Sequence, residues 1–498
     1  MTLRELLKGL EIKEIRGPAD VEISGIAYNS RLIKKDFLFV AVSGFVSDGH
    51  DYIQDAVSRG AAAVIAEKAE WTDSVEKLVK QGGLSYIVTS DSRKALALIA
   101  STYYGRPSGS FPIVAITGTN GKTTTGYITR HILKAWGKDT GLLGTNEYIL
   151  GERTLDAPRT TPESLDIQRY LREMLDNGME YSVLEVSSHA LTLERIEGCA
   201  FKIAVFTNFS QDHLDFHGTM ERYFSAKSRL FSYLSEDGAA VLNYDDPAVR
   251  TLTQSLGCRV ITCGFQEGAM LRAVNIRDRD VPGGLLFEVR TPEGGFAVES
   301  VLVGRFNVYN ILMAIGAAYA LGIDVETIQR GVREAEVIKG RFEKIDEGQD
   351  FICIVDFAHT EDALEKLIKE ARRITGGRVI TVFGCGGDRD RTKRPRMGAS
   401  ASDLSDLVIV TSDNPRSEDP SEIIRDIFKG IERDNCSVQL DRTKAIREAV
   451  EMAEKGDILL IAGKGHEDYQ EIKGVKASFS DKEVLIKELK SRHGERCH

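Results

Sequence analysis

The sequence predicts an α/β protein of three domains, in which the central and the C-terminal domain are each built around a parallel sheet. The chain has 498 residues, a length that suits roughly three domains of about 100–200 residues each. From the second domain onward, short apolar runs alternate with helical patterns, which is typical of parallel α/β construction. Two interruptions of this pattern suggest where the domains meet.

The first interruption is the turn-forming segment 106–112 (RPSGSFP), which follows an apparent helix at 92–104. The second lies at 337–340, after a helical stretch at 325–335 and before new strand-like residues. We therefore expect an N-terminal domain at 1–108, a central domain at 109–338 and a C-terminal domain at 339–498.

Apolar runs of strand length define the two predicted sheets. The central strands are expected at 113–117, 182–186 and 202–207, and a second sheet at 352–356, 379–384, 407–411 and 458–463. Open parallel sheets bind ligands beyond the carboxyl ends of their strands. Nearly every unusual cluster of polar residues in this sequence follows such a strand, so we expect a Rossmann-like C-terminal domain and ligand sites at the strand ends.

Composition excludes several classes of protein. The formal charge of −10 disfavours a nucleic-acid partner, which needs a basic surface. No 18-residue apolar run occurs, and the N-terminus lacks an apolar signal segment, so neither membrane spanning nor secretion is expected. The seven cysteines are scattered without a CxxC pair. We expect a cytoplasmic monomer with reduced thiols that binds small molecules.

The segment Gly118, Thr119, Asn120, Gly121, Lys122, Thr123 and Thr124 follows the first central strand and precedes a helical stretch at 125–136. A glycine turn that leads into a helix offers backbone N–H groups to phosphates, while lysine adds a cation and threonine can ligate Mg²⁺. Ile116 stands where the general P-loop pattern requires its first Gly. The central domain is therefore expected to be a P-loop-type ATPase domain, with a plain glycine turn as the alternative.

The other two central strands also end in chemically reactive side chains. Glu185 closes the second strand, and His213 follows the third in the segment 207–217. Mg²⁺ prefers carboxylates, phosphates and water, so Glu185 beside a triphosphate is a candidate ligand. The alternative is that both residues only make structural hydrogen bonds.

Nine motifs carry a resemblance to a known family. In chain order they are GTNGKTT, EVSSHAL, TNFSQDHLDFHG, YFSAKSRLF, GRFNVYN, VDFAHTEDAL, FGCGGDRDRTKRP, SDNPR and GKGHEDYQ. Together they resemble the Mur ligases of peptidoglycan precursor synthesis over almost the whole chain. The resemblance implies an ATP- and Mg²⁺-dependent, amide-bond-forming ligase that activates a carboxylate as an acyl phosphate and couples it to an amine.

The resemblance also implies roles at the nucleotide site. Lys122 would neutralise phosphate charge, Thr123 and Glu185 would hold one Mg²⁺, and His213 would serve a second. Lys227, within AKSRLF, would be carbamylated to give an anionic metal ligand. The alternative for Lys227, on an expected helix at 220–234, is a solvated surface charge.

Four further residues are expected at the nucleotide by resemblance. Asn307 and Asn310, spaced three apart on one helical face, would bind the adenine end of ATP. The alternative is that Asn307 caps the helix. Arg341 and Asp356 would contact phosphate and ribose.

The implied amino-acid substrate is meso-2,6-diaminopimelate, bound in the C-terminal domain. Arg416 would pair with its second carboxylate and Glu467 with an ammonium group. The other implied contacts are Arg389, Asp413, Asn414, Pro415 and Gly463. An Asn-Pro turn with a weak surface ion pair at Arg416 is the alternative.

The implied nucleotide-sugar substrate is UDP-MurNAc-L-Ala-D-Glu, whose D-Glu γ-carboxyl would be activated. Its expected contacts are Tyr28, Ser30, Phe45, Val46, Ser47, Thr160, Thr161, Ser187 and Arg195. Asn29 replaces an Asp that is commoner in this motif of the family.

Three other functions remain open from the sequence. A sister ligase would add L-lysine, and an enzyme similar to folylpolyglutamate synthase would share only the ATP-binding core. From a different class, a nucleotide-dependent switch would hydrolyse ATP without ligation. DNPR argues against the first alternative, and the N-terminal domain with GKGHE against the second.

Overall fold

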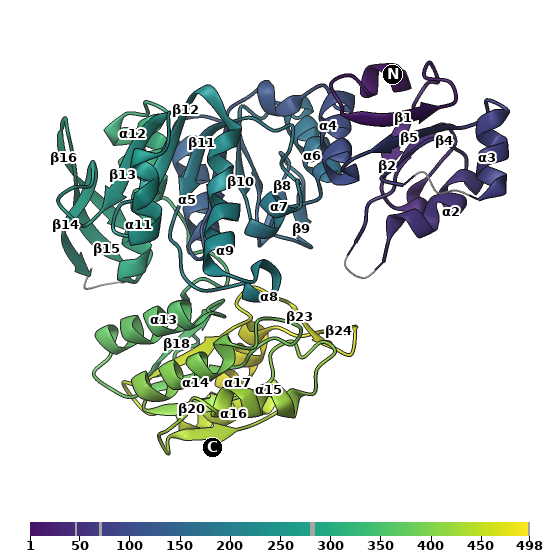
Figure 1. The fold of residues 1–498 in the computed structure, drawn as a ribbon. Coiled ribbons are helices and arrows are strands. Elements are labelled where there is room, and N and C mark those ends of the chain that lie inside the picture. The colour runs from purple at the N-terminus through teal and green to yellow at the C-terminus, as the bar shows by residue number, and fades with distance from the viewer. Residues whose placement is uncertain (45–46, 69–71, 279–283, 497–498) are drawn as a thin grey trace. The chain divides into compact units, whose positions relative to one another are not determined.

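The computed structural model of the chain describes residues 1–44, 47–68, 72–278 and 284–496. It divides into two compact units. The first unit consists of Met1–Thr117, Gly137–Ala204 and Ala226–Ala240. The second unit consists of Gly118–Trp136, Val205–Ser225 and Val241–His498. Figure 1 shows an α/β construction throughout. The predicted boundaries near residues 108 and 338 stay predictions.

The N-terminal part of the first unit is built on one sheet with the strand order β1-β5-β4-β3-β2. Strand β1 is antiparallel to β5, and the other neighbours are parallel. Alternate residues of β3 enter two separate apolar clusters, Leu38 in one and Phe39 in the other, because successive side chains of a strand point to opposite faces. The elements are α1 (Leu3–Leu6), β1 (Ile12–Arg16), β2 (Gly25–Ala27), β3 (Phe37–Val40), α2 (Ile53–Ser58), β4 (Ala61–Ala66), α3 (Asp73–Lys80), β5 (Ser85–Thr89) and α4 (Ser92–Tyr103).

A second sheet has eleven strands in the order β16-β15-β14-β13-β12-β11-β6-β10-β7-β8-β9. Strand β10 is parallel to both β6 and β7, as predicted. The three predicted central strands are consecutive neighbours, and each lies within one residue of its expected bounds. The elements are β6 (Ile113–Thr117), β7 (Thr140–Leu143), β8 (Glu147–Ile149), β9 (Thr154–Asp156), α6 (Ser164–Asp176), β10 (Tyr181–Glu185), α7 (Ser188–Thr192), β11 (Phe201–Phe206) and β12 (Leu234–Asn243).

Two predicted helices have different bounds. The helix expected at 125–136 is α5 (Lys122–Ala135), so Lys122, Thr123 and Thr124 form its first turn. The helix expected at 220–234 is α9 (Met220–Ser228), followed by a 3₁₀ turn at Arg229–Tyr233. The other elements before the C-terminal sheet are α8 (Leu214–His217), α10 (Pro247–Arg250), β13 (Arg259–Gly264), β14 (Leu271–Asp278), β15 (Leu285–Thr291), β16 (Gly294–Ser300), α11 (Arg305–Ala320) and α12 (Val325–Arg333).

The C-terminal sheet has the order β17-β18-β22-β19-β20-β21. All neighbours are parallel except β17, which pairs antiparallel at one edge. Its four predicted strands are present within one residue of their expected ends. The elements are β17 (Glu343–Ile345), β18 (Ile352–Asp356), α13 (Glu361–Ile374), β19 (Val379–Phe383), α14 (Lys393–Leu404), β20 (Leu407–Val410), α15 (Pro420–Phe428), β21 (Cys436–Val438), α16 (Arg442–Met452), β22 (Ile458–Ala462), β23 (Tyr469–Ile472), β24 (Val475–Ser478) and α17 (Asp481–Arg496).

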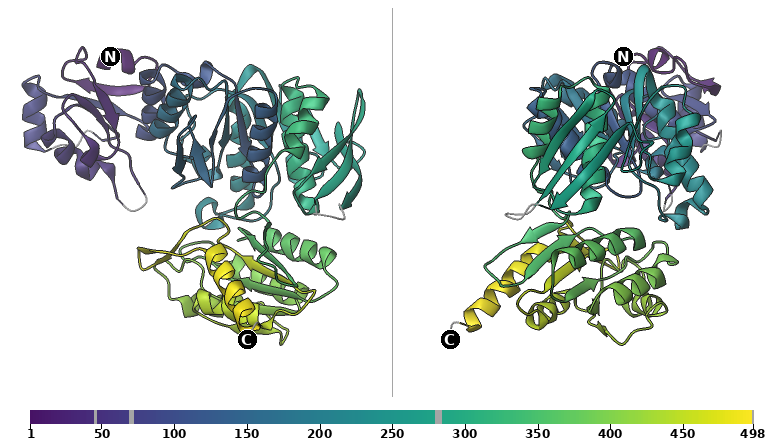
Figure 2. Two further views of the ribbon diagram at one scale, coloured as in Figure 1. Left: turned by 180° about the vertical axis from the view of Figure 1, so that it is seen from behind. Right: turned by 90° about the vertical axis from the view of Figure 1, so that its left-hand side faces the viewer.

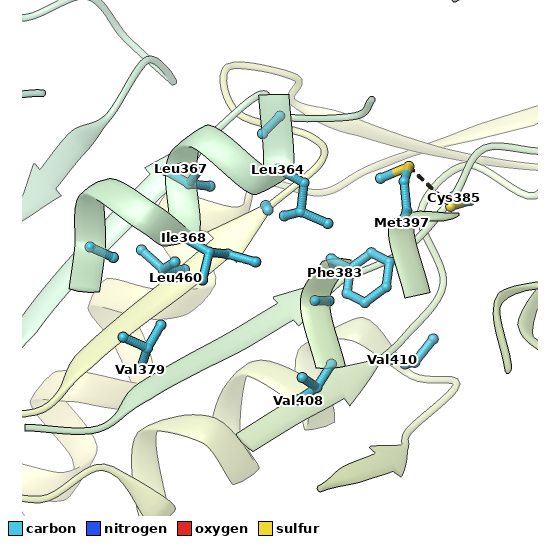
Figure 3. Packing of buried hydrophobic residues seen from close by; sticks show 14 of the residues in the cluster. Leu364, Leu367, Ile368, Val379, Phe383, Cys385, Met397, Val408, Val410 and Leu460 are labelled. Atoms are coloured by element: carbon cyan, nitrogen blue, oxygen red, sulfur yellow. Dashed lines mark hydrogen bonds between the residues drawn. The ribbon is translucent and has the colours of Figure 1, made fainter. Parts of the chain in front are cut away.

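Helices cover both faces of this sheet, as a Rossmann-like domain requires (Figure 2). On one face Leu364 and Leu367 of α13 pack with Phe383 and Leu460 (Figure 3). On the other face, residues of α16 and α17 pack with the intervening strand residues, such as Leu459. Two buried layers fix the sheet, so the loops at the strand ends are carried by a rigid support.

A buried ion pair joins the two helices of the second face. Arg442 Nε donates to Asp481 Oδ1 at 2.7 Å and Arg442 Nη2 to Asp481 Oδ2 at 2.8 Å, and both side chains are fully buried. Asp481→Ala should lower the free energy of unfolding by about 3 kcal/mol, because it leaves a buried guanidinium without its carboxylate. Native-state amide hydrogen exchange in β22 measures this loss.

The control is Lys490→Ala in the same helix, because Lys490 is 66% exposed in its 3.5 Å ion pair with Glu347. It should cost less than about 1 kcal/mol. Equal losses in the two variants would contradict a special contribution from the buried pair.

Among the described residues, none of the helices combines the length and apolar character needed to cross a membrane.

Candidate active site

The glycine loop after β6 is held in a conformation that only glycine adopts easily. Gly118 has φ +145° and Gly121 φ +84°. A Cβ on Gly121 would lie 2.2 Å from Asn310 Oδ1, and one on Gly118 would lie 1.9 Å from Thr207 Oγ1. The loop leads directly into α5 at Lys122. Because the first N–H groups of a helix have no partner within it, this turn can bind an anion.

The predicted lysine folds back over this loop. Lys122 Nζ donates to the carbonyl oxygens of Gly118 at 2.8 Å and of Thr119 at 3.0 Å. Arg341 Nη2 donates to Thr123 Oγ1 at 3.1 Å. Two cations and the start of a helix therefore lie at one place, which suits a polyphosphate.

The two predicted asparagines lie together in α11 and are both buried. Asn310 Nδ2 donates to Asn307 Oδ1 at 2.9 Å, and Asn307 Nδ2 donates to the Val303 carbonyl at 2.7 Å. The N-cap of the helix is Gly304, so the alternative of a cap by Asn307 is wrong. Since Asn310 also faces Gly121, the pair lies beside the glycine loop.

Glu185 is fully buried at the end of β10, and its register partner in β6 is Ile116. Its carboxylate accepts from the Thr145 N–H at 2.9 Å and from Thr145 Oγ1 at 2.8 Å. Thr145 Oγ1 also accepts from Thr160 Oγ1 at 3.1 Å. Glu185 thus has structural hydrogen bonds, and the end of its strand lies next to the strand from which the glycine loop follows.

A second group of predicted residues surrounds the same strand end. Thr161 Oγ1 donates to the Glu185 carbonyl at 2.9 Å and accepts from the Ser187 N–H at 3.0 Å. Arg195 Nη1 donates to the Thr161 carbonyl at 3.1 Å, and its Nη2 lies 2.8 Å from Glu163. Burial lowers the pKa of Arg195, against the raising effect of Glu163. The buried Arg195 guanidinium therefore holds the backbone of Thr161 in place.

His213 has φ +53° in the loop before α8, and its Nε2 lies 3.3 Å from Asp212 Oδ2. Asp212 is buried, and Lys393 Nζ lies 3.6 Å from its Oδ1. Burial alone would raise the pKa of Asp212, but Lys393, His213 and His359 hold it well below its usual range. Asp212 is thus an anion that orients a predicted metal ligand, and the sequence analysis missed it.

Lys227 is only 1% exposed in α9. The alternative of a solvated surface charge is therefore wrong.

Among the described residues, no group of three or more His, Cys, Asp or Glu side chains could hold a metal ion. The predicted Mg²⁺ ligands are of another kind, because they combine a hydroxyl, a carboxylate, an imidazole and a modified lysine. The hydroxyl, carboxylate and carbamate oxygens of this set fit Mg²⁺, which keeps waters and phosphate oxygens among its other ligands.

The C-terminal sheet brings the predicted amino-acid contacts together at its strand ends. Asn414 Nδ2 donates to Glu467 Oε2 at 2.8 Å, while Lys464 Nζ donates to Asn414 Oδ1 at 3.0 Å and to Glu467 Oε2 at 2.9 Å. Burial and the nearby Asp413 raise the pKa of Glu467, and Lys464 opposes them. Lys464 is fully buried and was not among the predicted site residues.

The two predicted arginines approach each other on neighbouring loops. A Cβ on Gly386 would lie 2.9 Å from Arg416 Nη1 and 3.8 Å from Arg389 Cγ. Burial lowers the pKa of Arg389, and the positive charge of Arg416 lowers it further. Arg416 Nη1 donates to the Gly387 carbonyl at 2.8 Å, and the Arg416 side chain is 18% exposed. Arg416 Nε also lies 3.7 Å from Glu471 Oε2, so the alternative of a weak ion pair at Arg416 stays open.

Three family models match the chain. They are described as the Mur ligase family catalytic domain at residues 22–104, the Mur ligase middle domain at 116–318 and the Mur ligase glutamate ligase domain at 340–465. A UDP-N-acetylmuramoyl-L-alanyl-D-glutamate–2,6-diaminopimelate ligase of Geobacillus kaustophilus (strain HTA426) is 43% identical over 501 residues, which cover 99% of this chain and 100% of that protein.

The chain belongs to the Mur ligase family.

Solved Mur ligases share its fold. A structure of UDP-N-acetylmuramoyl-L-alanyl-D-glutamate–2,6-diaminopimelate ligase has a TM-score of 0.66 and 32% identity, with 99% of each chain covered. A MurF ligase from Thermotoga maritima, solved in complex with ADP, has a TM-score of 0.65 and 20% identity, with 95% of this chain and 98% of that chain covered. The second likeness concerns the fold alone. The fold class predicted from the sequence is confirmed.

Other predicted substrate contacts of this Mur ligase lie in its N-terminal part. Tyr28 OH donates to Asp166 Oδ2 at 2.9 Å, and burial and the Asp166 charge raise its pKa. Ser30 is buried, directly after Asn29, whose side chain accepts from the Arg31 N–H at 3.0 Å. Asn29 therefore supplies the capping acceptor that an Asp would supply there. Ser47 is exposed, and the predicted contacts Phe45 and Val46 lie outside the described residues.

Asp356 makes two short hydrogen bonds at the end of β18. Its Oδ2 accepts from the Phe342 N–H at 2.6 Å and its Oδ1 from the Ala358 N–H at 2.7 Å. Burial raises its pKa, although Arg341 and these two N–H groups lower it. Asp356 thus fixes the segment that carries Arg341, a role that the sequence analysis did not foresee.

Proposed function

We propose that this Mur ligase adds meso-2,6-diaminopimelate to the D-Glu γ-carboxylate of UDP-MurNAc-L-Ala-D-Glu, with ATP as the energy source, in peptidoglycan precursor synthesis. One observation carries the choice of amine. Two arginines, Arg389 and Arg416, lie close together, and the charges of Arg416 and Glu467 both act on the pKa of Tyr469. Cations beside an anion suit an amino-acid end that carries both a carboxylate and an ammonium group, which diaminopimelate has twice and lysine only once.

The reaction has two steps. The γ-carboxylate oxygen attacks the γ-phosphorus of ATP, which gives an acyl phosphate and ADP. The amine nitrogen then attacks the acyl carbon, and the resulting tetrahedral intermediate loses phosphate and a proton to give the amide. Phosphoryl transfer depends on positioning and charge neutralisation. Lys122 and the N–H groups at the start of α5 would bind the phosphates, and Asn307 and Asn310 the adenine end.

Thr123, Glu185, His213 and carbamylated Lys227 would hold Mg²⁺. When bound, the metal ion neutralises charge on the phosphate oxygens. Asp212 would orient the imidazole of His213 through the 3.3 Å contact. Thr160, Thr161, Ser187 and Arg195 would bind the UDP-MurNAc-dipeptide beside Glu185.

We also propose domains at 1–108, 109–338 and 339–498 for the nucleotide-sugar, ATP and amino acid, respectively. A cytoplasmic location and a monomeric state are parts of the same proposal.

Phosphate release tests the proposal directly. The purified protein should release phosphate from ATP only when both UDP-MurNAc-dipeptide and diaminopimelate are present. Hydrolysis without either substrate would instead favour a nucleotide-dependent switch. Equal use of L-lysine would favour the lysine-adding sister ligase.

Lys227→Ala should lose ligase activity, and added formate should restore part of it. Lys227 is buried, and a small carboxylate fits the space of the missing carbamate and supplies its oxygen ligands. Activity is measured with and without formate. Mass spectrometry of the gently handled wild type should show an added carboxyl group on Lys227. Full activity of the alanine variant without formate would reject the carbamate.

A further inference from the structure

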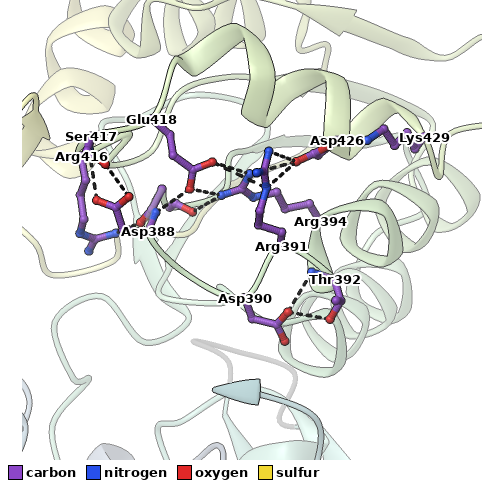
Figure 4. Close-up of polar contacts among 12 residues, drawn as sticks. Asp388, Asp390, Arg391, Thr392, Arg394, Arg416, Ser417, Glu418, Asp426 and Lys429 are labelled. Carbon is purple, nitrogen blue, oxygen red and sulfur yellow. Dashed lines mark hydrogen bonds and ion pairs between the residues drawn. The ribbon is translucent and has the colours of Figure 1, made fainter. Parts of the chain in front are cut away.

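A fully buried guanidinium, that of Arg394, is bonded to the loop that precedes Arg389. Arg394, in the first turn of α14, donates from Nη1 to Glu418 Oε2 at 2.9 Å and from Nη2 to Glu418 Oε1 at 2.7 Å. Its Nη1 also donates to Asp426 Oδ2 at 3.0 Å, and its Nη2 to the Gly386 carbonyl at 3.3 Å (Figure 4). The Arg394 side chain is 0% exposed. Charge-assisted bidentate pairs of this kind are strong and directional.

The partners of Arg394 connect two loops. Glu418 Oε1, which accepts from Arg394, also accepts from the Asp388 N–H at 2.6 Å. Asp388 in turn accepts from Ser417 Oγ at 2.6 Å and from the Ser417 N–H at 3.2 Å. One loop carries Arg389 and the other carries Arg416. A single chain of hydrogen bonds therefore runs from Arg394 across both loops (Figure 4).

The backbones of these loops are also in direct contact. The Gly387 N–H donates to the Asn414 carbonyl at 2.9 Å, and Arg416 Nη1 donates to the Gly387 carbonyl at 2.8 Å. A Cβ on Gly387 would lie 1.9 Å from the Pro415 carbonyl oxygen. Asp388 and Arg416 both have positive φ, +54° and +53°, a conformation that costs energy in residues other than glycine. Surrounding contacts must hold such a conformation in place.

The positively charged side chains of Arg389 and Arg416 both lie near Gly386. Arg389 and Arg416 repel each other, and the charge of Arg416 lowers the pKa of Arg389. Arg394 binds the Glu418 carboxylate, which accepts from the Asp388 N–H, and it also donates to the Gly386 carbonyl. We propose that Arg394 is a positioning residue, which sets the spacing of Arg389 and Arg416 to match one carboxylate of the amino-acid substrate. This inference rests on the proposed function, because it takes diaminopimelate as the substrate of that site.

Arg394→Lys tests the proposal, since it keeps the charge but removes the planar fork that binds Glu418. We expect KM for diaminopimelate to rise by about tenfold or more, because small displacements of binding groups have large kinetic effects. KM for ATP and for UDP-MurNAc-dipeptide should stay within about twofold, as their contacts are elsewhere. A general loss of folding would change all three together.

A second variant covers the case in which Arg394→Lys does not fold. Glu418→Gln keeps the shape of its side chain, leaves Arg394 its pair with Asp426, and weakens the link to Asp388. It should raise KM for diaminopimelate in the same selective way. The matched control is Arg391→Ala, because Arg391 contacts the same Asp426 at 3.1 Å but is 60% exposed. This control should leave all three KM values within about twofold.

The outcomes separate this inference from the proposed function. If the wild type does not use diaminopimelate, the proposed function fails. If the wild type uses it, but the folded Arg394→Lys and Glu418→Gln variants keep its KM, the positioning role is overturned. A parallel rise of KM for all three substrates would overturn it as well, because that result indicates a structural role only.

Discussion

Lys122→Ala should lower kcat/KM by about 10³-fold or more, which in practice abolishes ligation. Lys122 brings a cation over the glycine loop, where its Nζ contacts the carbonyl oxygens of Gly118 and Thr119. Charge builds up on the transferred phosphoryl group, and removal of one group that stabilises it typically costs about 3–4 kcal/mol. Ligation is measured as ADP formation that requires all substrates.

Lys134→Ala is the matched control, because this exposed lysine lies in the last turn of the same helix. It should leave activity within about twofold of the wild type. Activity of Lys122→Ala within about threefold of the wild type would refute the assignment of the glycine loop to phosphate binding, since such a contact should be worth several kcal/mol.

Strands of the two predicted sheets could be located from the sequence because their residues are apolar on both faces. β19 and β22 are examples, with alternate residues in two separate cores. The antiparallel strands β14, β15 and β16 were missed. They alternate buried and exposed residues and contain Arg, Asp and Glu, so they do not form the continuous apolar runs on which the prediction depended.

The start of α5 could not be read from propensities alone. Its first turn contains Thr123 and Thr124, and threonine is a poor helix former because its branched side chain loses freedom there. The prediction therefore began the helix at 125, whereas it begins at Lys122. The difference matters, because it places the lysine and threonine of the glycine loop on the helix itself.

Buried charges were the hardest part of the candidate site to predict. A dense basic segment such as 389–396 is usually a solvated surface run, and Arg391 and Arg396 are indeed half exposed or more. In the same segment Lys393 and Arg394 are buried beside carboxylates. The partners Asp212, Glu418 and Asp426 lie far away in sequence, so only the folded structure reveals which charges are paired.

Arg416→Ala should reduce kcat/KM for diaminopimelate far more than for L-lysine, with ATP and UDP-MurNAc-dipeptide saturating. The two amino acids differ by one carboxylate. A charge-assisted bidentate pair with Arg416 favours the substrate that has it. Lysine would leave Arg416, whose side chain is 18% exposed, partly desolvated and without that anion. Sites that lose such a polar partner discriminate by roughly 10⁴-fold, so we expect a preference of this order in the wild type.

Arg416→Lys separates charge from geometry. It keeps a cation but loses the planar fork, so its preference for diaminopimelate should lie between those of the wild type and Arg416→Ala. The structure adds a reason for a large effect, because Arg389 lies close to Arg416 and its pKa is lowered by burial and by that charge. A bound carboxylate relieves this repulsion, whereas lysine does not. If the wild type uses both amino acids equally, or if Arg416→Ala weakens both alike, Arg416 does not select the amine and the lysine-adding alternative gains support.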